Sequence, residues 1–191
     1  MRARFSVKSP RFYSFFGACL VFSMSIFGCE ASVYDLVGRG DLEKLEQRLH
    51  DEPDLVHSRN ALGKTSLHYA VTYRQPKALA LLISNGAEVN VKDETGLMPL
   101  HVAAILNRID EAQLLLDAGA EVAARDDFGD TPLHSAALHG NREMLEFLLR
   151  HGADALARNV KGKTPRDLAL AHRKGDLANF LEAVERGLRE H

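Results

Sequence analysis

The sequence predicts an all-α solenoid of stacked helix pairs, in which one unit recurs along the chain. Three series of residues repeat every 33 positions, and each series comes from a different part of the unit. They are Gly63, Gly96, Gly129 and Gly162; Gly86, Gly119 and Gly152; and His68, His101 and His134. A fixed period of roughly 20 to 50 residues is typical of repeat arrays, whose units bury their apolar faces against their neighbours. With 46% apolar residues, the 191-residue chain can form such a core.

In three of the four units the first helix is predicted to begin at a threonine, and Met98 stands at this position in the other. Thr65, Thr131 and Thr164 can cap a helix N-terminus through the hydroxyl, and proline occupies the first helical position in three units. Small residues then line the helix and allow neighbouring helices to approach closely. These are Ala70, Ala103, Ala104, Ala136 and Ala137.

A second helix follows in each unit, because leucine-rich residues recur at the spacing of one buried stripe. The stripe comprises Leu79, Leu81, Leu82 and Ile83, then Leu114, Leu115 and Leu116, then Met144, Leu145, Leu148 and Leu149. Gly86, Gly119 and Gly152 end these helices in the left-handed conformation. Each finger-like loop that follows, such as 88–96, needs a tight turn, which its glycine supplies.

The repeated words resemble those of ankyrin repeats. The run from Thr131 to Ala136 matches the family's Thr-Pro-Leu-His-x-Ala helix start, and Gly119 with Ala120 matches its Gly-Ala pair after the second helix. The resemblance implies an ankyrin-repeat solenoid of helix-turn-helix units with β-hairpin fingers. It also implies that His68, His101 and His134 hydrogen-bond a neighbouring loop and do not bind metal.

The resemblance divides the chain into an N-terminal cap repeat at 29–62, three repeats at 63–92, 93–125 and 126–158, and a C-terminal cap repeat at 159–191. The first cap is expected to hold helices at 32–39 and 42–50. In the last cap Arg166 replaces the usual leucine, and a helix reaching Leu188 is expected to close the stack with polar residues outward.

Residues 1–28 are predicted to be a signal peptide. Arg2, Arg4, Lys8 and Arg11 precede a run without charge from Phe12 to Cys29, which is the order of a secretory signal. Its end, Ile26-Phe27-Gly28-Cys29, resembles the lipobox of bacterial lipoproteins, although a smaller residue than Phe27 is usual. This resemblance implies cleavage after Gly28 and lipid attachment at Cys29, and therefore a place on the periplasmic side of the envelope.

Two other interpretations of this segment remain open. Ordinary signal peptidase cleavage near Ala31 would release a soluble periplasmic or secreted product. The uncharged run is also at the lower limit for an uncleaved membrane anchor. All three place the body outside the cytoplasm, and the lipid anchor is the only membrane contact that we expect.

Charge argues against nucleic-acid binding. The first 28 residues contain four of the 24 basic residues and none of the 26 acidic ones, so the remainder has 20 bases against 26 acids, a net charge of −6. Binding to phosphates requires a basic surface. No catalytic constellation, cofactor motif or metal-ligand spacing is present, so neither an enzyme nor a cofactor is predicted. Asp126, Asp127 and Asp130 lack the calcium-loop spacing and are interpreted as a solvated finger tip.

The surface therefore carries the function that we expect, which is binding of another protein by a monomeric chain. Partners of ankyrin repeats usually meet the finger tips and the exposed side of the first helices, which form a concave face. The residues at those places are Tyr73, Leu97, Ile105, Leu106, Phe128, Asp130, Leu138 and His139. Their apolar members form a contact patch, unless some pack between repeats. A secreted, effector-like protein acting on host proteins is the alternative to an envelope binder.

Overall fold

The computed structural model describes residues 31–190, which belong to one compact unit apart from Ala31. Cys29 and the predicted signal peptide lie outside the described residues. The first-helix layer contains α1 (Val33–Arg39), α3 (Ser66–Thr72), α5 (Pro99–Leu106), α7 (Pro132–His139) and α9 (Pro165–Ala171). The second-helix layer contains α2 (Leu42–Asp51), α4 (Pro76–Ser84), α6 (Ile109–Asp117), α8 (Arg142–Arg150) and α10 (Gly175–Arg189).

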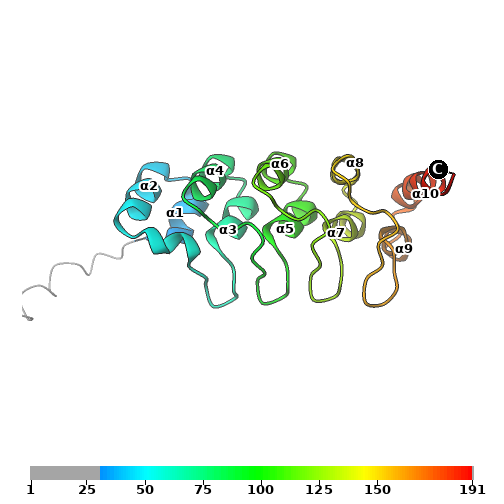
Figure 1. The fold of residues 1–191 in the computed structure, drawn as a ribbon, viewed down its shortest axis with the longest axis horizontal. Helices are drawn as coiled ribbons and strands as arrows, with labels where there is room; N and C mark the ends of the chain where they lie inside the picture. The colour runs from blue at the N-terminus through cyan, green and yellow to red at the C-terminus, as the bar shows by residue number, and fades with distance from the viewer. Residues whose placement is uncertain (1–30, 191) are drawn as a thin grey trace, which may run out of the picture. The chain divides into compact units, whose positions relative to one another are not determined.

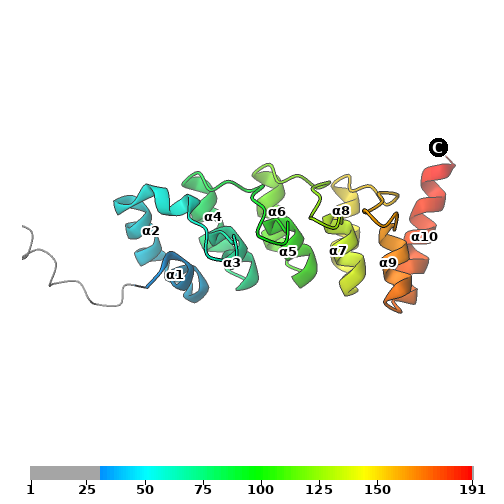
Figure 2. The same ribbon diagram turned by 90° about the horizontal axis from the view of Figure 1, so that it is seen from below.

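The two layers run side by side along the stack, and loops project from the first-helix layer on the side away from the second (Figure 1). Seen from the loop side, the first-layer helices follow one another in chain order (Figure 2). A short 3-10 helix, η1 (Pro53–His57), follows α2. No helix within residues 31–190 has the length and apolar character needed to cross a bilayer. The prediction of an all-α repeat fold is confirmed.

The core is a continuous row of leucines between the layers. Leu79 and Leu82 of α4, Leu115 of α6, and Leu145 and Leu148 of α8 are all 0% exposed. They belong to the stripe that the sequence predicts for the second helices. The alanines that the sequence predicts to line the first helices are also fully buried, so small side chains bring successive first helices into contact.

The threonines cap their helices in two different ways. The Thr164 hydroxyl accepts a hydrogen bond from the backbone N–H of Asp167 at 3.2 Å, as expected for an N-cap. The hydroxyls of Thr65 and Thr131 instead lie 3.0 and 2.9 Å from the Nδ1 atoms of His68 and His134. Both threonines form a capping box with the histidine at the third helical position, so the imidazole shares the capping role with the hydroxyl that the sequence predicts.

The fingers are held by side-chain hydrogen bonds more than by strand pairing. The β-hairpins that the resemblance implies are not found in residues 31–190, where the one β-bridge is an isolated pair, Arg59 and Thr65. Instead, one Asn or Asp per finger accepts two backbone N–H groups across the turn through its Oδ1. These residues are Asn60, Asp93, Asp126 and Asn159, with bonds of 2.8 to 3.1 Å. Such side-chain turns reverse the chain without a ladder.

This arrangement corrects the interpretation of Asp126 as a solvated residue. Its side chain is 9% exposed and accepts the N–H groups of Phe128 and Asp130. Asp127, which follows it, is exposed. Asp126 is therefore a structural residue of the third finger.

The C-terminal repeat replaces a buried leucine with an ion pair. Arg166 stands where Leu67, Leu100 and Leu133 stand in the other repeats. Its guanidinium lies 2.8 Å from Glu182 and 3.8 Å from Glu185, both on α10. Because α10 is the last helix of the described stack, a charged pair at its contact with α9 keeps this end polar.

Candidate protein-binding surface

Three histidines connect each first helix to the next finger. The Nδ1 atoms of His68, His101 and His134 accept the backbone N–H of residues 65, 98 and 131 at 3.1, 3.3 and 3.1 Å. Because an amide N–H can only donate, Nδ1 carries no proton and Nε2 does. Each Nε2–H then donates to a carbonyl 29 residues later, at 3.0 to 3.1 Å, and the acceptors are those of Leu97, Asp130 and Lys163. The histidines are structural, as the resemblance implies.

Burial lowers the pKa of all three histidines below the usual 6.5, and the hydrogen bond to the carbonyl opposes this shift in part. The neutral ring is the form that the fold requires, because a proton on Nδ1 would face an amide N–H. Protonation therefore favours the unfolded chain.

We predict that the free energy of unfolding decreases as the pH is lowered below about 6.5, because the histidines of the unfolded chain then take up protons that those of the folded chain do not. Each full proton difference contributes a slope of about 1.4 kcal/mol per pH unit. Urea unfolding between about pH 7.5 and pH 5 measures it. The Thr164 amide N–H lowers the pKa of the Asp167 carboxyl below 3.8, so this group affects the pH dependence of stability only at more acid pH. A constant free energy of unfolding between pH 7.5 and 5 would contradict this account.

Four of the predicted contact residues are exposed. Tyr73 is 53%, Leu106 36% and Phe128 59% exposed, and His139 is also exposed. Tyr73, Leu106 and His139 occupy the same position in three successive repeats, at the end of α3, α5 and α7. They therefore form one row along the first-helix layer.

The other four predicted contact residues, Leu97, Ile105, Leu138 and Asp130, are half-buried. The expectation that Leu97, Ile105 and Leu138 face solvent is therefore only partly met, because they pack in part between repeats. Asp130 connects two fingers, since its Oδ1 accepts a hydrogen bond from Asn159 at 2.7 Å and its carbonyl accepts one from His101.

Aromatic stacking supports the first residue of the row. The ring centroids of Tyr69 and Tyr73 are 6.0 Å apart, and those of Tyr34 and Tyr69 are 5.0 Å apart. A Cβ at Gly38 would lie 3.5 Å from the Tyr73 ring, so that the ring rests against the α1 backbone. Tyr73 is therefore an exposed aromatic residue on a fixed support.

Sequence reasoning missed one contact candidate, Val160, which is 71% exposed on the fourth finger. Its equivalents in the preceding repeats are Asp127, Glu94 and Ala61, all exposed. Two acids and an alanine at the equivalent positions were the available signal, because they mark this position of the period as one that faces solvent. A valine at a solvent-facing place is the feature that stands out.

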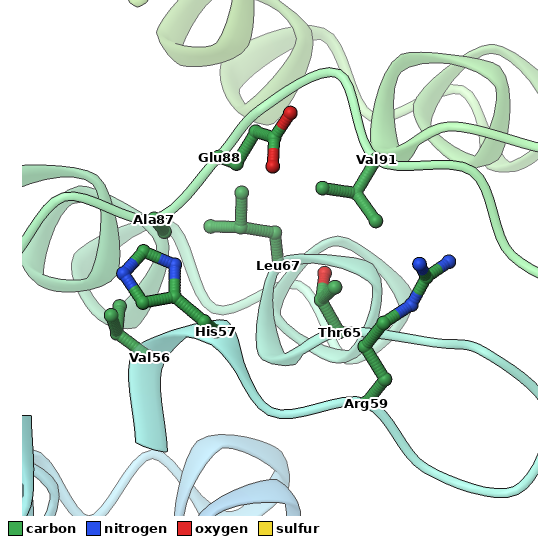
Figure 3. A pocket seen from close by; sticks show the side chains of 8 residues that line it. All are labelled: Val56, His57, Arg59, Thr65, Leu67, Ala87, Glu88 and Val91. Carbon is green, nitrogen blue, oxygen red and sulfur yellow. The ribbon is translucent and has the colours of Figure 1, made fainter. Parts of the chain in front are cut away.

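A small depression between the N-terminal cap and the first repeat does not form a ligand site. Figure 3 shows Leu67 between the side chains of His57 and Arg59 on one side and Glu88 and Val91 on the other. Its volume is about 80 Å³, enough for a few water molecules. Residues 31–190 also contain no cluster of three or more His, Cys, Asp or Glu side chains suited to a metal ion.

One acidic side chain, at the floor of a surface depression that Arg74 and Arg108 also line, is almost fully buried, and one of its oxygens has no partner. Glu111 of α6 is 1% exposed, and its Oε1 has no hydrogen-bond partner among residues 31–190. The equivalent positions hold Ala78, Met144 and Leu177, all apolar and buried. Burying a polar group without a hydrogen bond costs free energy.

We predict that Glu111→Met raises the free energy of unfolding by about 1 to 3 kcal/mol, the usual cost of an unsatisfied buried group. Methionine fills the same space, as Met144 does one repeat later. Glu143→Met, at an exposed position of α8, is the matched control and should change stability by less than about 0.5 kcal/mol. Chemical denaturation compares the two. A loss of stability in Glu111→Met would mean that the carboxylate is stabilised in a way that the geometry does not explain.

Comparison with known families agrees with the repeat architecture. Residues 67–105 and 100–149 match a family model described as ankyrin repeats in many copies. The matched stretch runs from α3 to α8 and includes all three histidines, two of their three connections to a following finger, and two of the four fingers. The match supports an ankyrin-repeat architecture for residues 67–149, and ankyrin repeats are in general non-enzymatic modules that mediate protein–protein interaction.

Proposed function

We propose that this chain is an exported, non-enzymatic binding protein that holds a partner protein on the concave face formed by its first helices and fingers. The observation that carries the proposal is the row of Tyr73, Leu106 and His139. A monomeric repeat protein does not need aromatic or aliphatic residues at such a solvent-exposed position. Large side chains of this kind provide much of the energy of protein interfaces.

A preformed surface suits this role. The histidine bonds fix each finger to the helix before it, and Asn141 of one repeat donates to the carbonyls of Ala104 and Ile105 in the repeat before, at 2.7 and 2.9 Å. Because the helices and fingers are already ordered, binding loses little conformational entropy. The partner class is a folded protein or segment that fits a concave face.

The cellular place is proposed from the sequence alone. The basic and then apolar N-terminus ending in Cys29 supports attachment to the periplasmic side of a bacterial envelope by a lipid. Labelling with a fatty acid, in the wild type and in Cys29→Ser, separates this proposal from a soluble secreted protein acting on host proteins. Label in the wild type alone supports the lipoprotein, whereas no label in either supports the secreted form.

Photo-crosslinking tests the binding face directly. A p-benzoylphenylalanine residue is placed at Leu106 on the concave row or at Ala80, which is exposed on α4 in the second-helix layer. In intact cells, we expect a discrete protein adduct from position 106 and none from position 80. Adducts from position 80 alone would assign binding to the other face.

A further inference from the structure

The third and fourth fingers, residues 125–130 and 158–163, are locked together. The N–H of Val160 donates to the carbonyl of Phe128 at 3.0 Å, and Arg125 Nη1 donates to the carbonyl of Arg158 at 2.7 Å. The bond from Asn159 to Asp130 adds a third connection. These two fingers therefore form one rigid platform.

The platform exposes two apolar side chains next to each other. Phe128 is 59% and Val160 71% exposed. A Cβ at Gly129 would lie 3.0 Å from Val160 Cγ1, so that the valine covers the backbone beside Phe128. We call Phe128 and Val160 the apolar pair.

Positive charge borders the apolar pair on one side. The fourth finger contains Arg158, Lys161 and Lys163, all exposed, and no acidic residue. The ion pairs found in residues 31–190 join other side chains, so both lysines remain available. Of the acids of the third finger, Asp126 is buried and Asp130 is bonded to Asn159, whereas Asp127 is exposed, so the positive charge of the platform lies on the fourth finger.

We propose that this platform binds an acidic segment of a partner protein, one that places an aromatic or aliphatic side chain against the apolar pair and carboxylates against Lys161 and Lys163. The proposal rests on the proposed function and adds the chemistry of the bound segment. Opposite charge around an apolar anchor favours the correct partner and speeds its association.

Other occupants fit the charges less well. The chain's own N-terminal residues 1–28 carry four basic and no acidic residues, so they do not complement lysines. A flat anionic membrane would meet all four finger tips, and Glu94, which is exposed on the second finger outside the platform, would be repelled there. A second copy of the chain has exposed acids in its N-terminal cap, at Asp51, Glu52 and Asp54, and this occupant is an outcome of the test.

The test uses the full-length protein and a fluorescein-labelled peptide of about twelve residues, with a central Phe-Leu flanked by glutamates. A matched peptide has lysine at each glutamate. Fluorescence anisotropy should show that the acidic peptide binds at least about tenfold more tightly than the basic one, and that its affinity falls as salt screens the charges.

Variants locate the binding site. Phe128→Ser, and separately Lys161→Glu with Lys163→Glu, should each weaken binding at least about tenfold with an unchanged melting midpoint. Leu62→Ser with Lys64→Glu is the control, because it replaces an exposed apolar residue and a lysine at the equivalent positions of the first finger, where Leu62 is 56% exposed and Lys64 is half-buried. The control should bind within about twofold of the wild type.

Several results would overturn the proposal. They are equal affinity for the two peptides, an equal loss in the control, and no binding of the acidic peptide. If sedimentation shows self-association of the wild type that is lost in Lys161→Glu with Lys163→Glu, the platform binds a second copy. If the wild type binds phosphatidylglycerol vesicles and this double variant does not, the platform binds a membrane. A crosslink at Leu106 without peptide binding would leave the proposed function standing and reject only this platform.

Discussion

Leu148→Ala in α8 is expected to lower the free energy of unfolding by about 2 to 5 kcal/mol. The side chain is 0% exposed and lies on the leucine row between the two layers. Truncation removes buried methyl groups and leaves a cavity that the packed repeats fill only in part. Because each repeat contacts only its neighbours, no distant part of the core replaces the lost contacts. Urea denaturation measures the change.

Phe128→Ala is the control for this prediction, since it removes a larger side chain from an exposed position. Its stability should stay within about 0.5 kcal/mol of the wild type. Ile105→Ala should lie between the two, because Ile105 is half-buried and contributes to packing as well as to the surface. A large loss at Phe128 would show that the finger tip is part of the core.

The repeat period made most of the fold predictable, because it marks the same structural position in each unit. The glycines after the second helices, the buried leucines and the histidines all lie where their series place them. The finger turns were harder to predict, because the residue that holds them is asparagine in two fingers and aspartate in the other two. These residues are Asn60, Asp93, Asp126 and Asn159. Their shared Oδ1 acceptor explains why the fingers reverse without the expected strand pairing.

The turn between the two helices of a repeat was hidden for a related reason. Arg74, Asn107, Gly140 and Arg173 all have positive φ, between 54° and 88°, at one position of the period. Glycine is the residue that signals this conformation, and only Gly140 is a glycine. Asn107 is a weaker signal for it, and the units with Arg74 and Arg173 make the turn with residues that carry none.

The binding surface was predictable by region but not residue by residue. Exposure depends on which side of a short helix a residue takes, and neighbours such as Ile105 and Leu106 differ, since one is half-buried and the other is 36% exposed. Successive residues of a helix point in directions about 100° apart, so adjacent residues at the end of a first helix can differ in exposure. The period identifies the row of Tyr73, Leu106 and His139 only after the exposure of one member is known.

Gly96→Ala and Gly162→Ala are expected to differ strongly, although both glycines lie at the same position of a finger. Their φ values are +76° and +68°, so an alanine at either pays about 1 to 2 kcal/mol for the left-handed conformation. A Cβ at Gly162 has no other atom within 4 Å, whereas one at Gly96 would overlap the backbone N and the carboxylate of Asp127 in the next finger.

The overlap at Gly96 adds about 1 to 3 kcal/mol for overpacking, so Gly96→Ala should lose about 2 to 5 kcal/mol in total. Gly162→Ala measures the conformational part alone, and the difference between the two measures how tightly the second and third fingers are pressed together. Urea denaturation of both variants gives this difference. Equal losses would mean that the second finger moves away from the third at little cost, in contrast to the hydrogen-bonded platform of the third and fourth fingers.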